Sequence, residues 1–388
     1  MSDFHPCVTR IQKIERHQNA DTLSIATVMD IYPVVIKTGE YNVGDLVSYI
    51  PYDAIVPDTE QFHFLAPQPK KDNAGNIVSP TPEVGSVPER YRTIKARKIR
   101  GQFSEGLIVP APPGFKEGDS IIDYFGLTKR VYEEELSELP NKKNKGSNEN
   151  EKGPKSFQLF KYDLEGFAKY AYAFNEGEEV IIQEKLDGEN CCIIYAEGRL
   201  WVRSRNYFKR NGYSTKKHGK FLNRLWINIT SFFKDLFEPK NKVALSHWWE
   251  VPIRLNLEEK LKAYPNLAIW GELYGNVSPL YYDTLIIDGK RQRKFRVFDI
   301  YNTKTKKFLE WSEVESLCLD IGLETVPILY KGSFKNDAKL LAMAEGKSTI
   351  GSHVKEGFVI RSIPESNHPK LGRRIIKLKG KDYKLFKG

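Results

Sequence analysis

Residues 184–190 read Glu184-Lys185-Leu186-Asp187-Gly188-Glu189-Asn190, and they join two apolar runs. Residues 180–183 (Val-Ile-Ile-Gln) precede them with a strand-like pattern, and residues 191–195 (Cys-Cys-Ile-Ile-Tyr) follow. Asp-Gly is typical of a hairpin tip, so one lysine amine is predicted at the mouth of a β-hairpin, with a carboxylate two residues away. Such an amine can attack phosphorus or a carbonyl carbon when its pKa is lowered. Any hairpin tip can have this sequence, so the motif alone is weak support for catalysis.

Five further segments follow Lys185 in a fixed order, and each combines a strand-like run with charged or polar residues. They are Ser204-Arg205-Asn206, residues 268–275 (Ala-Ile-Trp-Gly-Glu-Leu-Tyr-Gly), residues 295–301 (Phe-Arg-Val-Phe-Asp-Ile-Tyr), residues 356–361 (Glu-Gly-Phe-Val-Ile-Arg) and residues 375–379 (Ile-Ile-Lys-Leu-Lys). Together with the lysine motif, the series resembles the six motifs of the covalent nucleotidyltransferases, which include polynucleotide ligases and mRNA capping enzymes. The resemblance covers roughly residues 157–388.

This resemblance implies a set of roles for the motif residues. Lys185 would attack the α-phosphate of ATP and form a lysyl–AMP. Lys377 and Lys379 alternate along a predicted strand and therefore face the same side. They would hold the α-phosphate and stabilise its developing charge, and a nearby cation would lower the pKa of Lys185. The other expected nucleotide or phosphate contacts are Glu184, Asn190, Arg205, Glu272 (to a ribose hydroxyl) and Phe298 (stacked on adenine).

A divalent cation is also implied. Asp187, Glu272 and Glu356 carry hard oxygen donors that suit Mg²⁺ or Mn²⁺, held largely through water. Each of these residues also has an ordinary interpretation. Glu272 could be a strand-end carboxylate and Glu356 part of a turn, while Phe298 could belong to the core and the two lysines to a solvated strand face. The order of the six motifs favours the catalytic interpretation.

Length and composition limit the class of protein. At 388 residues, two or three domains are expected. No apolar run approaches the roughly 20 residues that a membrane span needs, and no apolar signal-peptide core follows Met1. Cys191 and Cys192 are adjacent in a predicted strand and point to opposite faces, so a disulfide between them is not expected. With Cys7 and Cys318 they lack a zinc-binding spacing, and the expectation is an intracellular chain without a membrane partner.

The basic charge is concentrated in the C-terminal half. Residues 158–388 carry 40 Lys and Arg against 28 Asp and Glu, whereas residues 1–128 carry 13 against 16. The surplus therefore lies in the same half as Lys185. This favours a phosphate-backbone partner at that part of the chain.

Three regions are predicted along the chain. Residues 1–128 contain short strand-like runs at 8–14, 24–29, 34–36, 46–49 and 106–109, which suggest an OB-like β-barrel. Residues 129–156 are charged and poor in apolar residues, which predicts a flexible linker with a short acidic helix at 133–138. Residues 157–388 are expected to form an α+β nucleotidyltransferase domain with antiparallel sheets, with helices near 221–236 and 256–264.

Several details of the N-terminal region bear on nucleic acid. Residues 16–23 resemble a signature near the start of tRNA-binding OB modules. Residues 90–100 interleave basic with aromatic and apolar residues, so Arg92, Lys95 and Arg97 are candidate contacts to a phosphate backbone; the alternative is a charged edge strand. Residues 61–82 are expected to be a long loop. Residues 43–49 and 117–124 are similar to each other, and each is expected to be a turn followed by an alternating strand.

The order of the regions separates members of the superfamily. Most DNA ligases and capping enzymes carry an OB domain after the last motif, whereas this sequence stops nine residues after Lys379 and has an OB-like module first. The arrangement resembles the RNA ligases of the Deinococcus/Naegleria type, the fifth RNA ligase family. That family implies transfer of AMP from ATP to the lysine and then to a 5′-phosphate end. A 3′-OH then seals the bond, with a nicked duplex as partner and RNA on the 3′-OH side.

Other interpretations stay open at this point. A GTP-dependent capping-type guanylyltransferase, a catalytically dead nucleic-acid-binding protein and a tRNA-binding accessory factor are the alternatives. A monomer is expected. Because all six motifs lie outside the OB-like module, that module is expected to serve sealing and not lysine modification.

Overall fold

Lys185 ends a strand that lies between two antiparallel neighbours in a five-stranded sheet, here named the Lys185 sheet. In the computed structural model, which describes residues 4–72, 76–130, 150–157, 159–211, 246–275, 282, 285–287 and 289–387, this sheet has the order β13-β28-β25-β14-β24. Its strands are β13 (Glu165–Gly166), β28 (Ile375–Lys379), β25 (Gly357–Ser362), β14 (Glu179–Lys185) and β24 (Ile328–Ser333). The short β13 pairs in parallel with β28, and the other pairs are antiparallel.

A second sheet, here named the Glu272 sheet, packs against the first. Its strands are β12 (Asn150–Glu151), β17 (Phe208–Lys209), β16 (Arg199–Ser204), β15 (Glu189–Ala196), β18 (Leu267–Tyr274), β21 (Lys294–Asn302) and β22 (Lys307–Phe308), in that order, with β23 (Glu324–Thr325) paired to β21. One hydrophobic core joins the two sheets, because Ile181 of β14 packs with Ile193 of β15 and Ile269 of β18. Two small hairpins complete the strands: β19 (Leu285–Ile287) with β20 (Lys290–Gln292), and β26 (Asn367–His368) with β27 (Gly372–Arg373).

Helices pack against one face of each sheet. The core that joins the two sheets also includes residues of η3 (His247–Trp249), α6 (Glu250–Arg254), α7 (Leu257–Leu261) and α8 (Trp311–Ile321). The core on the far side of the Lys185 sheet includes residues of α4 (Phe167–Tyr170), η2 (Ala171–Ala173) and α9 (Ala338–Ala342). The local sequence explains the limits of α8: Glu310 and Glu313 form a capping box, and Gly322 ends the helix in the left-handed conformation with φ of 67°.

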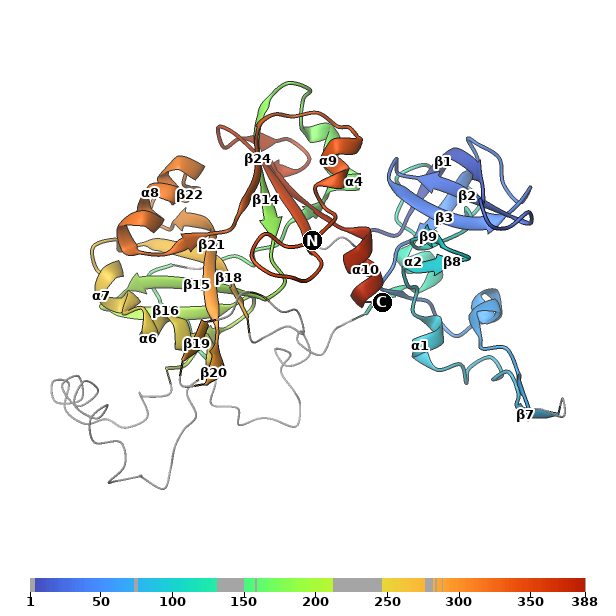
Figure 1. Cartoon of the computed structure of the whole chain (residues 1–388), viewed down its shortest axis with the longest axis horizontal. Helices are drawn as coiled ribbons and strands as arrows, with labels where there is room; N and C mark the ends of the chain where they lie inside the picture. The colour runs from blue at the N-terminus through green and yellow to red at the C-terminus, as the bar shows by residue number, and fades with distance from the viewer. Residues whose placement is uncertain are drawn as a thin grey trace.

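The N-terminal part is a separate curved sheet (Figure 1) with the order β10-β4-β1-β2-β3. Its strands are β1 (Cys7–Arg16), β2 (Leu23–Val28), β3 (Tyr32–Lys37), β4 (Leu46–Ile50) and β10 (Leu107–Pro110). The smaller elements are β5 (Ala54–Ile55), η1 (Glu60–Leu65), β6 (Lys70–Lys71), β7 (Ile77–Ser79), α1 (Glu89–Arg92), β8 (Arg97–Ile99), β9 (Gln102–Ser104), α2 (Ile122–Phe125) and β11 (Thr128–Lys129). The five strand-like runs expected from the sequence are therefore confirmed, as is the α+β class.

Some expected elements differ from the observed ones. Residues 43–49 lead into β4, but the similar stretch 117–124 leads into the helix α2, because Gly126 takes the left-handed conformation that ends a helical turn. Residues 90–100 are not one strand, since α1 occupies their start and only Arg97–Ile99 is extended. Residues 61–82 contain most of η1 together with β6 and β7. The predicted helices at 133–138 and 221–236 lie outside the described residues, whereas the helix expected near 256–264 is confirmed as α7.

The cysteines agree with expectation. All four are free and buried. Cys191 packs in the core between the two sheets, and Cys192 packs in the core on the other side of β15. The adjacent thiols therefore face opposite sides of the strand.

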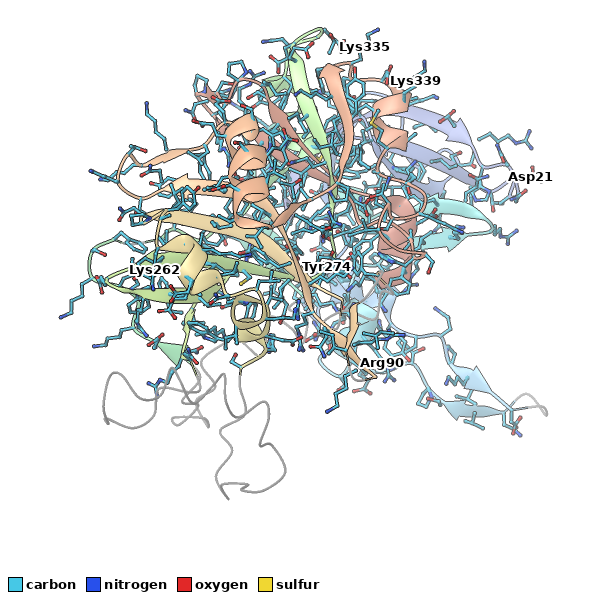
Figure 2. All side chains as sticks on the ribbon, turned by 60° about the vertical axis from the view of Figure 1, so that its left-hand side comes forward. Asp21, Arg90, Lys262, Tyr274, Lys335 and Lys339 are labelled. Atoms are coloured by element: carbon cyan, nitrogen blue, oxygen red, sulfur yellow. The ribbon has the colours of Figure 1, made fainter. Side chains whose placement is uncertain are left out.

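The helix α10 (Lys381–Lys387) follows β28 and lies between the C-terminal sheets and the OB-like module (Figure 1). Figure 2 shows how densely side chains fill the space between the sheets, with Tyr274 at the end of β18 well inside the molecule and Lys335 and Lys339 at its outer edge. In the part of the chain that the structure describes, no helix has both the length and the apolar character that a membrane crossing needs.

Candidate active site

Strand register places Lys185 in a row with two positions from the other motifs. Lys185 pairs with Gly357 of β25, and Gly357 pairs with Lys379 of β28. Gly357 has a φ of 150°, and a Cβ at this position would lie 1.9 Å from the carbonyl oxygen of Leu378, so only glycine allows this close approach. The row brings together residues that are far apart in the sequence at one edge of the Lys185 sheet.

Glu356 links the two lysines of this row. The Nζ of Lys185 donates a hydrogen bond to Oε2 of Glu356 at 2.8 Å, and the Nζ of Lys379 lies 3.8 Å from Oε1 of the same carboxylate. Glu356 itself is buried. The nucleophile predicted from the sequence, one predicted phosphate-binding lysine and one predicted metal ligand are therefore in direct contact.

A cavity of about 310 Å³ contains this row and most of the other predicted residues. Lys377 and Lys379 both line it, which confirms that they share one face of β28. The predicted site residues that line this cavity are Glu184, Lys185, Asp187, Asn190, Arg205, Glu272, Phe298, Glu356, Lys377 and Lys379.

The pKa of Lys185 differs from the expectation. Burial lowers it, but Glu356 and Glu272 raise it, and the lowering by Lys379 is too small to reverse their effect, so the net shift is upward. Lys379 lowers the pKa as expected for a neighbouring cation, but the Glu356 carboxylate, which lies in direct hydrogen-bond contact with the amine, outweighs this effect. In this state the amine is held as an ammonium ion.

Several carboxylates lie close to one another around Lys185. Burial raises the pKa of Glu272 to about 8, and Glu356, Asp187 and Glu189 raise it as well, while Lys185 opposes them. Carboxyl groups gathered in this way are an oxygen donor set that a hard divalent cation would stabilise. Among the described residues, no group of three His, Cys, Asp or Glu side chains is arranged to hold a metal directly. The expectation of Mg²⁺ or Mn²⁺ held through water stays a prediction.

This shift makes stability depend on pH. The carboxyl of Glu272 binds its proton more tightly in the folded chain than in the unfolded chain, so its contribution is complete below pH 4.5 and is lost as the pH rises to about 8. We expect the free energy of unfolding of the metal-free protein to fall across this window, by at most about 1.4 kcal/mol per pH unit and by less because Glu272 is only half-buried. Chemical denaturation at several pH values measures it. Glu272→Gln should flatten the profile, and an unchanged slope in that variant would contradict the assignment.

Phe298, the predicted stacking partner of the base, lies at the cavity. It is half-buried and lines the cavity, whereas Phe295 is buried in the core. The Nη2 of Arg361 donates to the carbonyl oxygen of Phe298 at 2.7 Å. Arg361 in turn belongs to a buried network in which Asp299 accepts from Arg361, Arg373 and Tyr162. This network fixes the backbone that carries Phe298.

Three predicted residues have contacts that the sequence did not indicate. Both carboxylate oxygens of Glu184 are used within the protein, since Oε1 accepts from Ser348 Oγ at 2.5 Å and Oε2 accepts from the backbone nitrogen of Thr349 at 2.8 Å. Its carboxylate is therefore an anchor for that loop and not a free nucleotide ligand. Arg205 and Lys377 both pair with Asp163, at 2.7 and 3.5 Å. The two cations lower the pKa of Asp163 against the effect of burial.

Two lysines of α10 complete the surroundings of the cavity. The Nζ of Lys387 lies 3.0 Å from Oδ2 of Asp187, one of the predicted metal ligands. The Nζ of Lys384 lies 2.6 Å from Oε1 of Glu105 in the OB-like module, and both side chains are buried. The ammonium of Lys384 also lies 5.2 and 5.3 Å from the ring centroids of Tyr32 and Tyr52. The helix thus contacts the lysine motif through Lys387 and the N-terminal part through Lys384.

The OB-like module forms part of the cavity wall. Tyr52, Asp53 and Lys129 line the cavity together with the motif residues. The expectation that the module serves sealing alone was based on the positions of the motifs, and this shared wall weighs against it. Sequence reasoning also missed Asp163, Lys384 and Lys387. For the two lysines, the only available signal was that three lysines lie between residues 381 and 387, directly after the last motif.

The predicted nucleic-acid contacts of the OB-like module lie apart from the cavity. Arg92 donates to the carbonyl oxygens of Val56 at 2.7 Å and Val87 at 3.0 Å, so its guanidinium supports the local backbone. Lys95 is half-buried and Arg97 is exposed. Of the three, Arg97 is the most accessible candidate, and Arg92 has a structural role that the sequence pattern did not show.

Comparison with known families agrees with this geometry. Residues 178–379, just over half of the chain, match the family model described as RNA ligase. The chain belongs to the RNA ligase family. Residues 6–111 match a model described as an OB-fold domain, so the expected N-terminal OB module of this RNA ligase family member is confirmed. No curated protein sequence matches the chain.

Solved structures show the same arrangement of both parts. Naegleria gruberi RNA ligase with PPi has a TM-score of 0.69 and 20% sequence identity, and the match covers 99% of this chain and 98% of that one. A lysine-to-alanine mutant of that ligase with ATP and Mn has a TM-score of 0.69 at 21% identity, with the same coverage. A lysine-to-methionine mutant with AMP and Mn has a TM-score of 0.67 at 21% identity, again covering 99% and 98%. At these identities the similarity is one of fold, and it confirms the Naegleria-type order of OB module and catalytic part.

Proposed function

We propose that this RNA ligase family member uses ATP to seal nicks between a 3′-OH and a 5′-phosphate, with RNA on the 3′-OH side. The reaction would pass through a lysyl–AMP and a 5′-adenylylated polynucleotide. The observation that carries the proposal is the contact of Lys185 with Glu356 at 2.8 Å, inside a cavity that Lys377, Lys379, Glu272 and Phe298 also line. The Naegleria ligase structures with ATP or AMP and Mn support the choice of nucleotide and metal.

In the first step the Nζ of Lys185 attacks the α-phosphorus of ATP. A nitrogen–phosphorus bond forms, the bond from that phosphorus to the bridging oxygen breaks, and pyrophosphate leaves. The amine must lose a proton to act, and Glu356 Oε2 at 2.8 Å is within reach to accept it. Lys379, 3.8 Å from the same carboxylate, would stabilise charge on the α-phosphate. Lys377, two residues earlier on the same face of β28, would stabilise the same charge.

The remaining groups would orient the nucleotide and the cation. Phe298 would stack on the adenine, and Glu272 would accept a hydrogen bond from a ribose hydroxyl. Asp187, Glu272 and Glu356 would hold Mg²⁺ or Mn²⁺ largely through water, and Lys387 would exchange its contact with Asp187 for solvent. When bound, the cation supplies charge stabilisation at the phosphates.

Later steps would take place on the nucleic acid. AMP passes from Lys185 to a 5′-phosphate, which restores the amine, and the 3′-OH then attacks that phosphate and expels AMP. Arg205 and Asn190 at the cavity would contact the 5′ end. The 40 Lys and Arg against 28 Asp and Glu in residues 158–388 support a nicked duplex as partner, and Arg97 with Lys95 would add contacts from the OB module.

Incubation with α-labelled ATP or GTP and a divalent cation, followed by denaturing electrophoresis, tests the proposal. The protein is first stripped of bound nucleotide with pyrophosphate. Label retained from ATP and released on adding a nicked duplex with an RNA 3′-OH strand is the expected result. Label from GTP alone would assign the chain to capping chemistry, and no label from either would overturn the proposal in favour of nucleic-acid binding without catalysis.

A further inference from the structure

Gln183 has a buried side chain whose polar atoms have no partner in the protein. It is 1% exposed, and neither its Oε1 nor its Nε2 has a hydrogen-bond partner among the described residues. Leaving a buried amide unpaired is costly in free energy, so such groups are rare in folded proteins. Gln183 also lines the cavity that contains Lys185. An amide that is costly for folding and lines a ligand cavity points to a role in binding.

The position of Gln183 in the sheet indicates which part of a ligand it would meet. It lies two residues before Lys185 in β14 and therefore on the same face of the sheet. Gln183 pairs with Val359, which pairs with Lys377, while in the next row Ile181 pairs with Arg361. Arg361 contacts the carbonyl oxygen of Phe298. Gln183 therefore shares its row with Lys377 and lies between the row of Lys185 and Lys379 and the row whose Arg361 contacts Phe298.

The chemistry of a carboxamide fits the edge of a purine base. It presents one acceptor and a donor side by side, and glutamine commonly accepts from the amino group of adenine while donating to a neighbouring ring nitrogen. A buried site of this kind discriminates strongly, because a ligand that lacks one of the groups leaves the amide unpaired. Phe298 offers only a ring face, which every base can use. Hydrogen-bond discrimination between bases thus needs a polar group such as Gln183.

We propose that Gln183 is the residue that selects the base of the nucleotide, by hydrogen bonds to the 6-amino group and an adjacent ring nitrogen of adenine. This rests on the proposed use of a nucleotide at Lys185. It adds a specificity determinant that does not take part in the phosphoryl transfer.

Binding measurements test the assignment without any reaction. Calorimetry compares AMP with purine riboside monophosphate, which lacks the 6-amino group, on the wild-type protein and on Gln183→Leu. We expect the wild type to prefer AMP by about tenfold to a hundredfold. The variant should bind both ligands within about twofold of each other, because it has no amide to leave unpaired. A variant that keeps the wild-type preference would overturn the proposal.

The stability of the variant supplies a second readout. Because Gln183→Leu removes an unpaired buried amide, we expect the melting temperature of the free protein to stay equal or rise while AMP binding weakens. If Gln183 had a purely structural role, the melting temperature of the variant would fall and its AMP binding would stay unchanged. Ile182→Val, on the opposite face of β14, is the matched control and should leave the preference for AMP unchanged. If Gln183→Leu fails to fold, Gln183→Met provides the same comparison with a side chain of similar length.

Covalent labelling separates this proposal from the proposed function. Wild-type protein that takes label from ATP but not from purine riboside triphosphate, with a Gln183→Leu variant that accepts both, supports both proposals. Label from ATP with unchanged discrimination in the variant contradicts the role of Gln183 alone. No label on the wild type, together with the expected binding preference for AMP, contradicts the proposed function alone.

Discussion

Replacing Lys185 with alanine is expected to abolish the covalent AMP adduct completely. The amine of Lys185 is the only lysine nitrogen in hydrogen-bond contact with Glu356 among the described residues, since Lys379 lies 3.8 Å away from that carboxylate. The reaction needs a nucleophile at this position, so no partial activity should remain. Denaturing electrophoresis with α-labelled ATP measures the adduct. An alanine variant that still forms it would remove Lys185 from the mechanism.

Two controls separate loss of the nucleophile from loss of structure. Lys185→Arg keeps a cation beside Glu356 and should preserve the melting temperature while also failing to form the adduct. Lys331 on β24 is exposed and pairs in register with Ile181 of β14. Lys331→Ala should therefore retain the full amount of label, because it removes a lysine from the same sheet without touching the cavity.

Replacing Asp299 with alanine is expected to cause the largest loss of stability. Asp299 has no exposed side-chain area, Arg361 has 1% and Arg373 has 15%, and Asp299 is the carboxylate that both arginines share. Removing one partner of a buried ion pair leaves uncompensated charge and typically costs about 3–5 kcal/mol. Tyr162 would also lose its acceptor. The midpoint of urea denaturation measures the change.

The same substitution should also affect the cavity. Arg361 holds the carbonyl oxygen of Phe298 at 2.7 Å, so a displaced arginine would loosen the backbone that carries this ring and weaken AMP binding. Asp299→Asn keeps a hydrogen-bonding group and should cost less than the alanine variant. Glu259→Ala removes a surface pair with Lys262 and should cost about 0–1 kcal/mol. Equal losses in Asp299→Ala and Glu259→Ala would show that the buried network does not stabilise the fold.

Much of the site could be predicted because its residues lie in strands. Lys185, Lys377 and Lys379 each have a fixed direction relative to their neighbours along a strand, so the alternation of side chains gives their shared face without any knowledge of the packing. The order of the motifs then indicated Glu272, Phe298 and Glu356, and all of them line one cavity. The OB module was predictable for the same reason, from short alternating runs between turns.

The remaining features depend on contacts between distant segments. Asp163 pairs with Lys377 across 214 positions, and no local pattern marks such a carboxylate. The pKa of Lys185 depends on which neighbour is nearest, and the sequence gives the identity of the neighbours but not their distances. Residues 122–125 form the helix α2 in a stretch where a strand was expected. The sequence of these four residues is compatible with both helical and strand periodicity, and the decisive signal, Gly126, lies beyond them.

The buried pair of Glu105 and Lys384 has a consequence for synthesis of the chain. The two residues are 279 positions apart, so the OB module is made long before its partner lysine. At a translation rate of roughly 5–20 residues per second, about 14–56 s pass between the synthesis of Glu105 and that of Lys384. Throughout that interval the carboxylate must remain hydrated on the surface of a module that is otherwise ready to fold. The face of the OB module that α10 covers is therefore open and charged in the nascent chain until translation reaches this helix.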